Sequence, residues 1–487
     1  MNIVDLVLFQ CRQQPPAAAI CVPGPGIGLI SYRRLEQFIH NISRRVLSLG
    51  LPPGSTVAVK IDDVIFHSAV LLALARLGIT TLSLRENVSS LPFRIDALLS
   101  DATLPAVQFD RVVLCDLSWT EGDGRPVERQ YLPVVSDNDI CRLILTSGTT
   151  GVPKAVAVSH RLLSDRISRH LTVFGNRLPR CDRVYSDMPL STSLGFQFLI
   201  YTLWRGGTAF FPGDRFDSTL QAIEEYKVQC LVAPPSGLET LLRWYEVVAA
   251  YQSNLEVIVC GGDVLSRTLS ARVRSRICSH LIAAYGSTEA SMTATAHAQA
   301  IDGKPGAVGY VTPGNVVQIV DRSGAVLPPG QEGHVRIRSD YAVDSYLGNP
   351  EESAKVFRDG WFHPGDIGTV DSDDLLVITG REQTVLNVGG DKINPEVIER
   401  VLSAFPDVVD AGVFSAPNDL GNNEVCAAIV GREGIDLQKL RAHCEAHLSP
   451  GYLPSKVFLA QALPRNEMGK IDRPRLAELA RQPVSRR

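Results

Sequence analysis

The sequence of this 487-residue chain lacks several patterns that would assign it to a class at once. Its longest apolar stretch, residues 64–77, contains His67 and Arg76 and falls short of the roughly 20 residues needed to span a bilayer. Lys and Arg number 48 against 52 Asp and Glu, for a net charge of −4, so the chain has no basic excess typical of proteins that bind nucleic acid or anionic membranes. We therefore expect neither as a partner.

The ten cysteines form no metal-binding pattern, because none belongs to a CxxC pair or to a Cys/His cluster with metal-ligand spacing. We interpret them as core thiols in a reducing compartment. The first apolar run of the chain ends at Gln10, and no basic leader with a small-residue cleavage site is present there. We therefore expect no signal peptide, and a soluble protein that is cytoplasmic.

The composition indicates a globular protein of at least two domains. Hydrophobic residues make up 45% and charged residues 21%, and the length is about three times a common domain size of roughly 150 residues. Apolar residues at helical spacing in 31–50 are followed by a strand pattern, TVAVK, at 56–60, and this alternation continues. It predicts an α/β fold with layered mixed or parallel sheets flanked by helices. A smaller α+β pattern begins after about Gly380, with helices expected at 395–404 and 437–447 and strands at 411–414 and 425–430.

The most informative segment is the loop TSGTTGVPK, residues 146–154, which follows a predicted strand. Its glycines, hydroxyls and lysine suit phosphate oxygens, because backbone N–H groups can converge where no Cβ intrudes. It is not a Walker A loop, since Gly148 and Gly151 are separated by two residues instead of four and Lys154 comes later. A P-loop NTPase is therefore disfavoured, and a polar surface turn remains the alternative.

This loop resembles the signature loop of the adenylate-forming superfamily, which contains acyl-CoA synthetases, nonribosomal-peptide adenylation domains and luciferases. Further motifs of that superfamily follow in the expected order, and the resemblance to acyl-CoA synthetases covers almost the whole chain. These motifs are YGSTE at 285–289, WFHPGDIG at 361–368, the pair Gly380-Arg381 that opens the hinge, and GKIDR at 469–473.

The resemblance implies an ATP-dependent carboxylic acid:CoA ligase that works through an acyl-AMP. Glu289 then binds Mg²⁺, which prefers carboxylate and phosphate oxygens, and Thr288 contacts the phosphate. Lys470 is implied to be the catalytic lysine that bridges the carboxylate and the α-phosphate. By the same resemblance Tyr285 packs beside the adenine, Asp366 holds the ribose hydroxyls and Arg381 supports the nucleotide, whereas Asp263 meets either the adenine or a polar substrate group. The residues implied to bind ATP or AMP are Thr146, Ser147, Gly148, Thr149, Thr150, Gly151, Lys154, Asp263, Tyr285, Gly286, Thr288, Asp366, Arg381 and Lys470.

The chain departs from the family pattern at Thr192, where many acyl and aryl ligases carry His and amino-acid activators carry Asp. A buried ammonium without a carboxylate partner would be costly, so this departure argues against a free α-amino acid as substrate. We expect an aliphatic or aromatic acid instead. For Phe196 and Phe198, core packing is the alternative to lining the pocket. By alignment with family segments, the expected acyl pocket consists of Thr192, Phe196, Phe198, Ser236, Gly261, Gly262, Gly286 and Met292.

The resemblance also implies a small mobile domain that rotates between the two half-reactions. We place the domains at 1–382 and 383–487, with Gln383 at the hinge. The pair Gly389-Gly390 is implied to line the pantetheine tunnel for CoA, and it is also readable as a plain hairpin turn. Two other functions remain alternatives: a free-standing adenylation enzyme that loads the phosphopantetheine of a carrier protein, and a catalytically silent protein that binds a nucleotide or acyl ligand.

Overall fold

The computed structural model describes residues 2–24, 28–84, 91–102, 109, 111–146, 153–174, 178–213, 218–247, 253–382, 386–388, 391–417, 423–448, 450–465 and 470–481. They fall into two compact units. The larger unit comprises residues 1–302, 309–316 and 337–362, and the smaller unit comprises 303–308, 317–336 and 363–487. Neither unit contains a helix, among its described residues, that is long and apolar enough to cross a membrane.

The first sheet of the larger unit has six strands in the order β6-β5-β3-β4-β7-β8. All neighbours are parallel except β7 and β8, which form an antiparallel pair. The strands are β3 (Thr56–Lys60), β4 (Thr80–Ser83), β5 (Ala97–Ser100), β6 (Val112–Leu114), β7 (Ile140–Thr146) and β8 (Lys154–Ser159). The strand predicted at 56–60 is therefore confirmed.

Three helices follow in a packed group: α3 (Val64–Arg76) packs against β3 and β4, and α1 (Ile3–Gln13) and α2 (Tyr32–Ser48) pack against α3. The helix predicted within 31–50 is α2, and it forms because its apolar face, including Leu35, Phe38 and Ile39, is buried. It begins where the Ser31 side chain accepts a hydrogen bond from the backbone N–H of Arg34.

The second sheet of the larger unit includes strands in the order β14-β13-β12-β11-β9-β10-β1-β2. The run from β13 to β1 is parallel throughout, as predicted for an α/β fold. The strands are β1 (Ala18–Val22), β2 (Gly28–Ser31), β9 (Arg183–Ser186), β10 (Thr208–Phe210), β11 (Cys230–Ala233), β12 (Val257–Gly261), β13 (Leu281–Ser287) and β14 (Ser291–His297).

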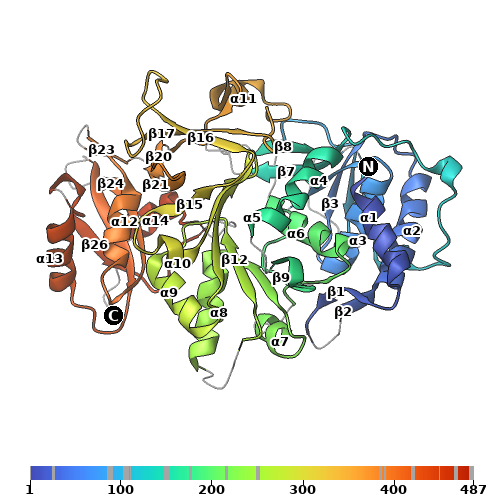
Figure 1. Cartoon of the computed structure of the whole chain (residues 1–487), viewed down its shortest axis with the longest axis horizontal. Helices are drawn as coiled ribbons and strands as arrows, with labels where there is room; N and C mark the ends of the chain where they lie inside the picture. The colour runs from blue at the N-terminus through green and yellow to red at the C-terminus, as the bar shows by residue number, and fades with distance from the viewer. Residues whose placement is uncertain are drawn as a thin grey trace. The chain divides into compact units, whose positions relative to one another are not determined.

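Both faces of this sheet are covered (Figure 1). Along β12, Val257 and Val259 join one apolar cluster, and Ile258 and Cys260 join another, as the alternation of side chains along a strand requires. The first cluster includes α6 (Ser193–Trp204), and the second includes α8 (Pro235–Val247) and α9 (Arg267–Arg276). Further helices and strands between residues 160 and 362 are α4 (His160–Ser168), α5 (His170–Val173), α7 (Ser218–Glu224), α10 (Ala298–Ile301), β15 (Ala307–Val311), β16 (Asn315–Val320), β17 (Gly333–Ser339), α11 (Pro350–Val356), β18 (Phe357–Arg358) and β19 (Trp361–Phe362).

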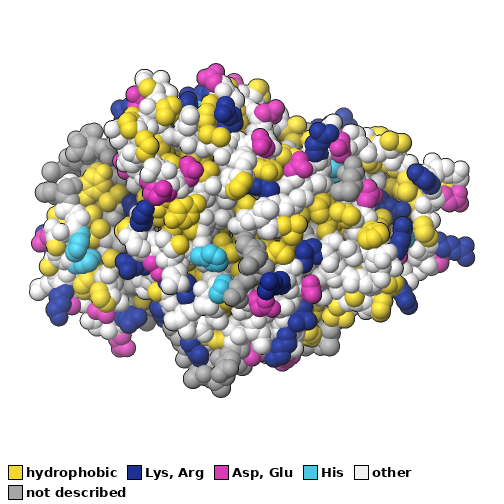
Figure 2. All heavy atoms as spheres, in the orientation of Figure 1, with side chains coloured by type: hydrophobic (Ala, Val, Ile, Leu, Met, Phe, Trp, Pro, Cys, Tyr) yellow, Lys and Arg dark blue, Asp and Glu magenta, His cyan; other side chains and the backbone are white. Residues whose placement is uncertain are grey.

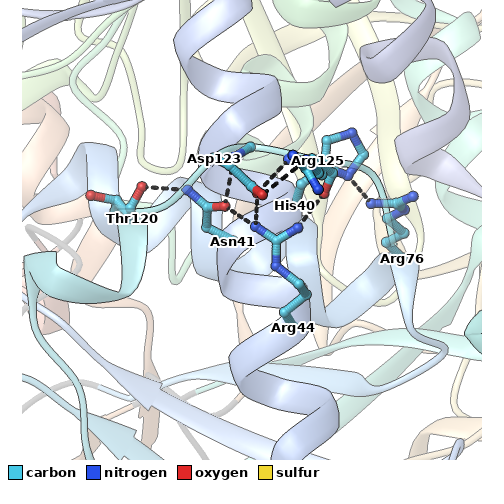
Figure 3. A network of polar contacts seen from close by, with 8 residues as sticks. His40, Asn41, Arg44, Arg76, Thr120, Asp123 and Arg125 are labelled. Atoms are coloured by element: carbon cyan, nitrogen blue, oxygen red, sulfur yellow. Dashed lines mark hydrogen bonds and ion pairs between the residues drawn. The ribbon is translucent and has the colours of Figure 1, made fainter. Parts of the chain in front are cut away.

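A polar network on α2 fixes the loop that follows β6 (Figure 3). Asn41 Nδ2 donates to the Thr120 carbonyl at 2.8 Å, and Arg44 Nη2 lies 2.9 Å from Asp123 Oδ1. Nearby, Arg76 Nη1 lies 2.5 Å from Nδ1 of the buried His40. Burial, and after it the neighbouring Arg76 guanidinium, lowers the pKa of His40 to about 4, which favours the neutral imidazole.

The smaller unit carries a three-stranded sheet, β24-β25-β26, with its own apolar core. Its elements are β20 (Asp366–Val370), β21 (Leu375–Arg381), β22 (Leu386–Val388), β23 (Asp391–Ile393), α12 (Pro395–Ser403), β24 (Val408–Pro417), β25 (Asn423–Gly431), α13 (Leu437–His447), β26 (Lys456–Leu459) and α14 (Arg473–Arg481). The helices and strands predicted after Gly380 are confirmed, and with them the fold class of a large α/β part and a small α+β part.

The cysteines agree with the sequence analysis, and one face of the surface mixes both charge signs. On the face drawn in Figure 2, basic and acidic side chains are interspersed and do not gather by sign. All ten cysteines are free and buried, which confirms that they are core thiols. Burial raises the pKa of several of them, for example to about 12 for Cys141.

Candidate active site

The expected substrate residues of the larger unit come from four segments that meet at one edge of the second sheet. Strands β9, β11, β12 and β13 are parallel neighbours, so their carboxyl ends lie side by side. Ligands of open α/β sheets bind outside this edge. The segments that leave it contain Thr192 after β9, Ser236 after β11, Gly261 and Gly262 at the end of β12, and residues 285–289 at the end of β13.

The turn between β13 and β14 carries Thr288 and Glu289 and has a tightly defined backbone. Gly286 lies opposite Met292, and a Cβ at Gly286 would lie 2.2 Å from the Ser291 carbonyl oxygen, so only glycine fits there. Ser291 has a left-handed φ of 60°, which is strained for a residue with a side chain. The sequence YGSTE therefore forms a preorganised turn.

Arg166, on α4, anchors the backbone of this turn. Its side chain is buried, and it donates to the carbonyls of Thr288 at 3.1 Å, Glu289 at 3.0 Å and Tyr341 at 2.9 Å. Burial lowers the pKa of Arg166 to about 10, so the guanidinium remains charged at neutral pH. The sequence analysis missed this residue, although an arginine between the buried Leu163 and Ile167 of one helix is a detectable signal.

The Glu289 side chain is buried and is oriented by Tyr346. Its Oε1 accepts a hydrogen bond from the Tyr346 hydroxyl at 2.8 Å, whereas its Oε2 takes no hydrogen bond from any residue in the described part of the chain. Burial raises the pKa of Tyr346 above its usual range, and the neighbouring Glu289 carboxylate raises it further. The phenol therefore keeps its proton. An open carboxylate oxygen on a buried side chain suits a hard cation such as Mg²⁺.

Lys154 lies close to the Tyr346 ring. Its Nζ is 5.2 Å from the ring centroid and 2.7 Å from Oε2 of Glu352, on α11. Hydrogen bonds from Lys154 and Lys355 lower the pKa of Glu352 to about 2, so this ion pair persists over the physiological pH range. Tyr346 and Glu352 were not among the predicted site residues, because they come from a segment almost 200 residues beyond Lys154.

Two of the expected pocket side chains have partners that favour the core alternative. The Phe196 ring stacks against the guanidinium of the buried Arg142, 4.6 Å from its centroid. The Phe198 ring packs 4.8 Å from that of His170. The Thr192 hydroxyl caps α6, accepting from the Gly195 amide at 3.1 Å and donating to the Pro189 carbonyl at 2.7 Å.

The structure adds two residues that border the glycine pair at the end of β12. Leu194 Cδ2 lies 3.7 Å from where a Cβ of Gly261 would be, and Met188 Cε lies 3.5 Å from the corresponding point of Gly262. These contacts supply apolar surface beside Cβ-free backbone. The remaining candidates Ser236 and Met292 are half-buried, and Asp263 Oδ1 accepts from the Val264 amide at 2.8 Å.

In the smaller unit, Asp366 and Arg381 face each other across β20 and β21. Arg381 Nε donates to Oδ1 of the buried Asp366 at 2.6 Å. Two predicted nucleotide-binding residues of the smaller unit are thus brought together. Lys470 is half-buried just before α14 and next to Ile471, which bridges to Arg465.

Several predicted site residues lie outside the described residues. Thr146 and Lys154, which flank the phosphate-type loop, pair across β7 and β8 and hold its two ends together. The predicted residues outside the described ranges are Ser147, Gly148, Thr149, Thr150, Gly151, Gln383, Gly389 and Gly390.

Comparison with known proteins gives consistent matches over the length of the chain. Residues 9–347 match the family model of AMP-binding enzymes, and residues 397–470 match that of the AMP-binding enzyme C-terminal domain. A 4-chlorobenzoate–CoA ligase from Arthrobacter sp is 27% identical over 97% of this chain and 94% of its own length. A feruloyl-CoA synthase from Amycolatopsis sp is 28% identical over 95% of this chain and 96% of its own. Among solved structures, the amide bond synthetase McbA from Marinactinospora thermotolerans superposes with a TM-score of 0.81 at 26% identity, covering 98% of this chain and 99% of its own.

Proposed function

Because this chain belongs to the AMP-binding enzyme family, within the adenylate-forming superfamily, we propose that it is an ATP-dependent carboxylic acid:CoA ligase. It activates an aliphatic or aromatic carboxylate as an acyl-AMP and then transfers the acyl group to the thiol of CoA. The observation that carries this proposal is the turn with Thr288 and Glu289, which Arg166 and Tyr346 hold at the ligand-binding edge of the sheet.

In the first half-reaction a carboxylate oxygen of the acid attacks the α-phosphorus of ATP. The bond from that phosphorus to the bridging oxygen breaks, and pyrophosphate leaves with the electron pair. Charge spreads over the phosphoryl oxygens in the transition state, so preorganised donors and cations lower the barrier. Thr288 contacts the phosphate, and Lys470 bridges the carboxylate and the α-phosphate.

Glu289 would hold Mg²⁺, with its open Oε2 as the ligand atom. When bound, the metal ion neutralises phosphate charge. The protein contributes the fixed position of that oxygen: Arg166 anchors the backbone of the turn, and the Tyr346 hydroxyl fixes the rotation of the carboxylate. Asp366 binds the ribose hydroxyls, and Arg381 holds Asp366 in place.

In the second half-reaction the sulfur of CoA, having lost its proton to solvent, attacks the acyl carbonyl, and AMP leaves. We assign the pantetheine path to Gly389-Gly390 and the hinge to Gln383, so that 1–382 and 383–487 act as the two moving parts. A carrier-protein phosphopantetheine presents the same thiol, and it remains the alternative acceptor.

The test of the function is ATP–pyrophosphate exchange across a panel of carboxylic acids, followed by addition of CoA or of a phosphopantetheinylated carrier protein. We expect acid-dependent exchange with at least one aliphatic or aromatic acid, and then an acyl-CoA product that mass spectrometry detects. Exchange followed by transfer to the carrier protein alone would favour the alternative acceptor. If the folded protein shows no exchange with any acid of the panel, the proposal is contradicted.

The role of Tyr346 gives a separate prediction. Tyr346→Phe removes the hydrogen bond that orients Glu289, and hydrogen bonds to charged groups contribute about 1.5–3 kcal/mol. We therefore expect exchange at limiting Mg²⁺ to fall about tenfold or more, with substantial recovery at saturating Mg²⁺. Tyr310→Phe, at an exposed tyrosine of the same unit, is the matched control. An unchanged Mg²⁺ dependence in Tyr346→Phe would contradict this role.

A further inference from the structure

One carboxylate at the ligand-binding edge of the second sheet has no assigned role. Asp187 directly follows β9, and its backbone N–H donates to the Val232 carbonyl of β11 at 2.8 Å. This bond fixes Asp187 between two of the strands whose carboxyl ends form the acyl pocket. It precedes Met188, whose Cε reaches the backbone of Gly262.

The Asp187 carboxylate is seated where α8 begins. A Cβ on Gly237 would lie 2.1 Å from Asp187 Oδ2, so the absence of a side chain at Gly237 makes room for the carboxylate. Gly237 is the neighbour of Ser236, one of the expected pocket residues. The carboxylate therefore borders the segment of α8 that belongs to the candidate pocket.

Within the described part of the chain, no side chain or backbone N–H donates a hydrogen bond to this carboxylate, and no cation pairs with it. Asp187 is half-buried, and burial raises its pKa to about 6. Keeping a carboxylate in such surroundings is unfavourable unless a cation or donor compensates it. At pH 7 and above the group is mainly ionised, and the described residues supply no such partner.

We propose that Asp187 is a specificity residue of the acyl pocket, and that the acid substrate carries a basic amino group whose ammonium pairs with this carboxylate. The inference rests on the proposed function and narrows its substrate class. The absence of a carboxylate at Thr192 argued against an ammonium in the substrate, but the chain supplies a carboxylate five residues earlier. Leu194, Gly261 and Gly262 then contact the apolar part of the acid.

The test compares acids that differ only by an amino group. Benzoate is paired with its 2-, 3- and 4-aminomethyl derivatives, and propionate and butyrate are paired with their amino derivatives, α-amino acids included. ATP–pyrophosphate exchange is measured without CoA at pH 8 for the wild type, Asp187→Asn and Asp182→Asn. Asp182 is an exposed aspartate at the opposite end of β9 and serves as the matched control.

For the wild type we expect at least one amino derivative to exceed its parent carboxylic acid in kcat/KM by about 30-fold or more. The reason is that loss of one partner of a desolvated charge pair costs about 2–5 kcal/mol. Asp187→Asn should remove most of this preference through a higher KM and leave the parent acid within about twofold. Asp182→Asn should keep the preference. Asp187→Lys should reverse it, favouring the dicarboxylic counterpart of the same acid.

Two results would overturn the inference. One is a wild type that uses the parent acids at least as well as every amino derivative. The other is an Asp187→Asn variant, folded by thermal melting, that loses activity equally on both members of a pair, since that shows a structural role at the start of α8. If Asp187→Asn does not fold, Asp187→Glu replaces it, and an unaltered amino preference despite the displaced carboxylate counts against the inference. Failure of the proposed function looks different, because then no acid of either kind supports exchange.

Discussion

Lys470→Ala is expected to lower acyl-AMP formation by about 10²- to 10³-fold, because it removes a cation from a preorganised site in which charge develops on the phosphoryl oxygens. The same variant should still convert chemically prepared acyl-AMP and CoA into thioester at a substantial rate. We expect this difference because the proposed function assigns Lys470 to the first half-reaction alone and Gly389-Gly390 to the second.

Both half-reactions are measured separately on the best acid of the panel. Lys439→Ala is the matched control, since Lys439 is an exposed lysine of the smaller unit that pairs with Asp436, the N-cap residue of the same helix. It should leave both rates unchanged. A folded Lys470→Ala protein that loses both steps to the same extent would rule out the separation of roles.

The larger unit is expected to lose stability steeply as the pH falls below about 6. Four of its histidines are buried, and burial lowers their pKa values to about 4 for His40 and His160 and about 3 for His67 and His170. An unfolded chain protonates these groups near pH 6.5, so between pH 6.5 and 4 the unfolded state binds more protons than the folded state. Stability is therefore fully present above pH 6.5 and is lost as the pH falls.

The slope follows from proton counting. Each histidine contributes about 1.4 kcal/mol per pH unit within this window, and the raised pKa of Asp187 offsets one of the four. A net of three protons gives about 4 kcal/mol per pH unit between pH 5.5 and 4.5. Urea unfolding at several pH values measures this slope of the unfolding free energy. A urea midpoint that does not change with pH would contradict the predicted role of the buried histidines.

A single substitution tests the assignment. His170 packs among Phe174, Phe198 and Tyr201, so His170→Phe retains an aromatic ring and removes one titrating group. Its slope should be smaller by about 1.4 kcal/mol per pH unit. His447→Gln, on an exposed histidine of the smaller unit, should leave the slope for the larger unit unchanged.

The fold was largely predictable because its local signals agree with its tertiary environment. In α2, apolar spacing and a serine cap define the same helix that the core requires. The parallel strands were predictable as a class from their alternation with helices. Strand order was not, because neighbours such as β9 and β11 are brought together by contacts that no local pattern encodes.

Residues of the candidate site were predictable only where they belong to a recognisable sequence motif. Thr288 and Glu289 stand in such a motif, but the groups that orient them, Arg166 and Tyr346, reach them from separate segments. Thr192 shows the converse. Its position in a family pattern suggested a pocket residue, whereas its hydroxyl caps α6, a role that a threonine three residues before Gly195 also allows.

The ten buried thiols can be used to measure local opening of the folded protein. A thiolate reacts with alkylating reagents, and a buried thiol with a raised pKa hardly supplies one, so modification has to wait for a fluctuation that exposes the sulfur. Eight of the cysteines lie in the larger unit, whereas Cys426 and Cys444 lie in the smaller. Alkylation rates resolved by peptide mass spectrometry therefore give separate opening free energies for the two units of one native chain, without any introduced probe.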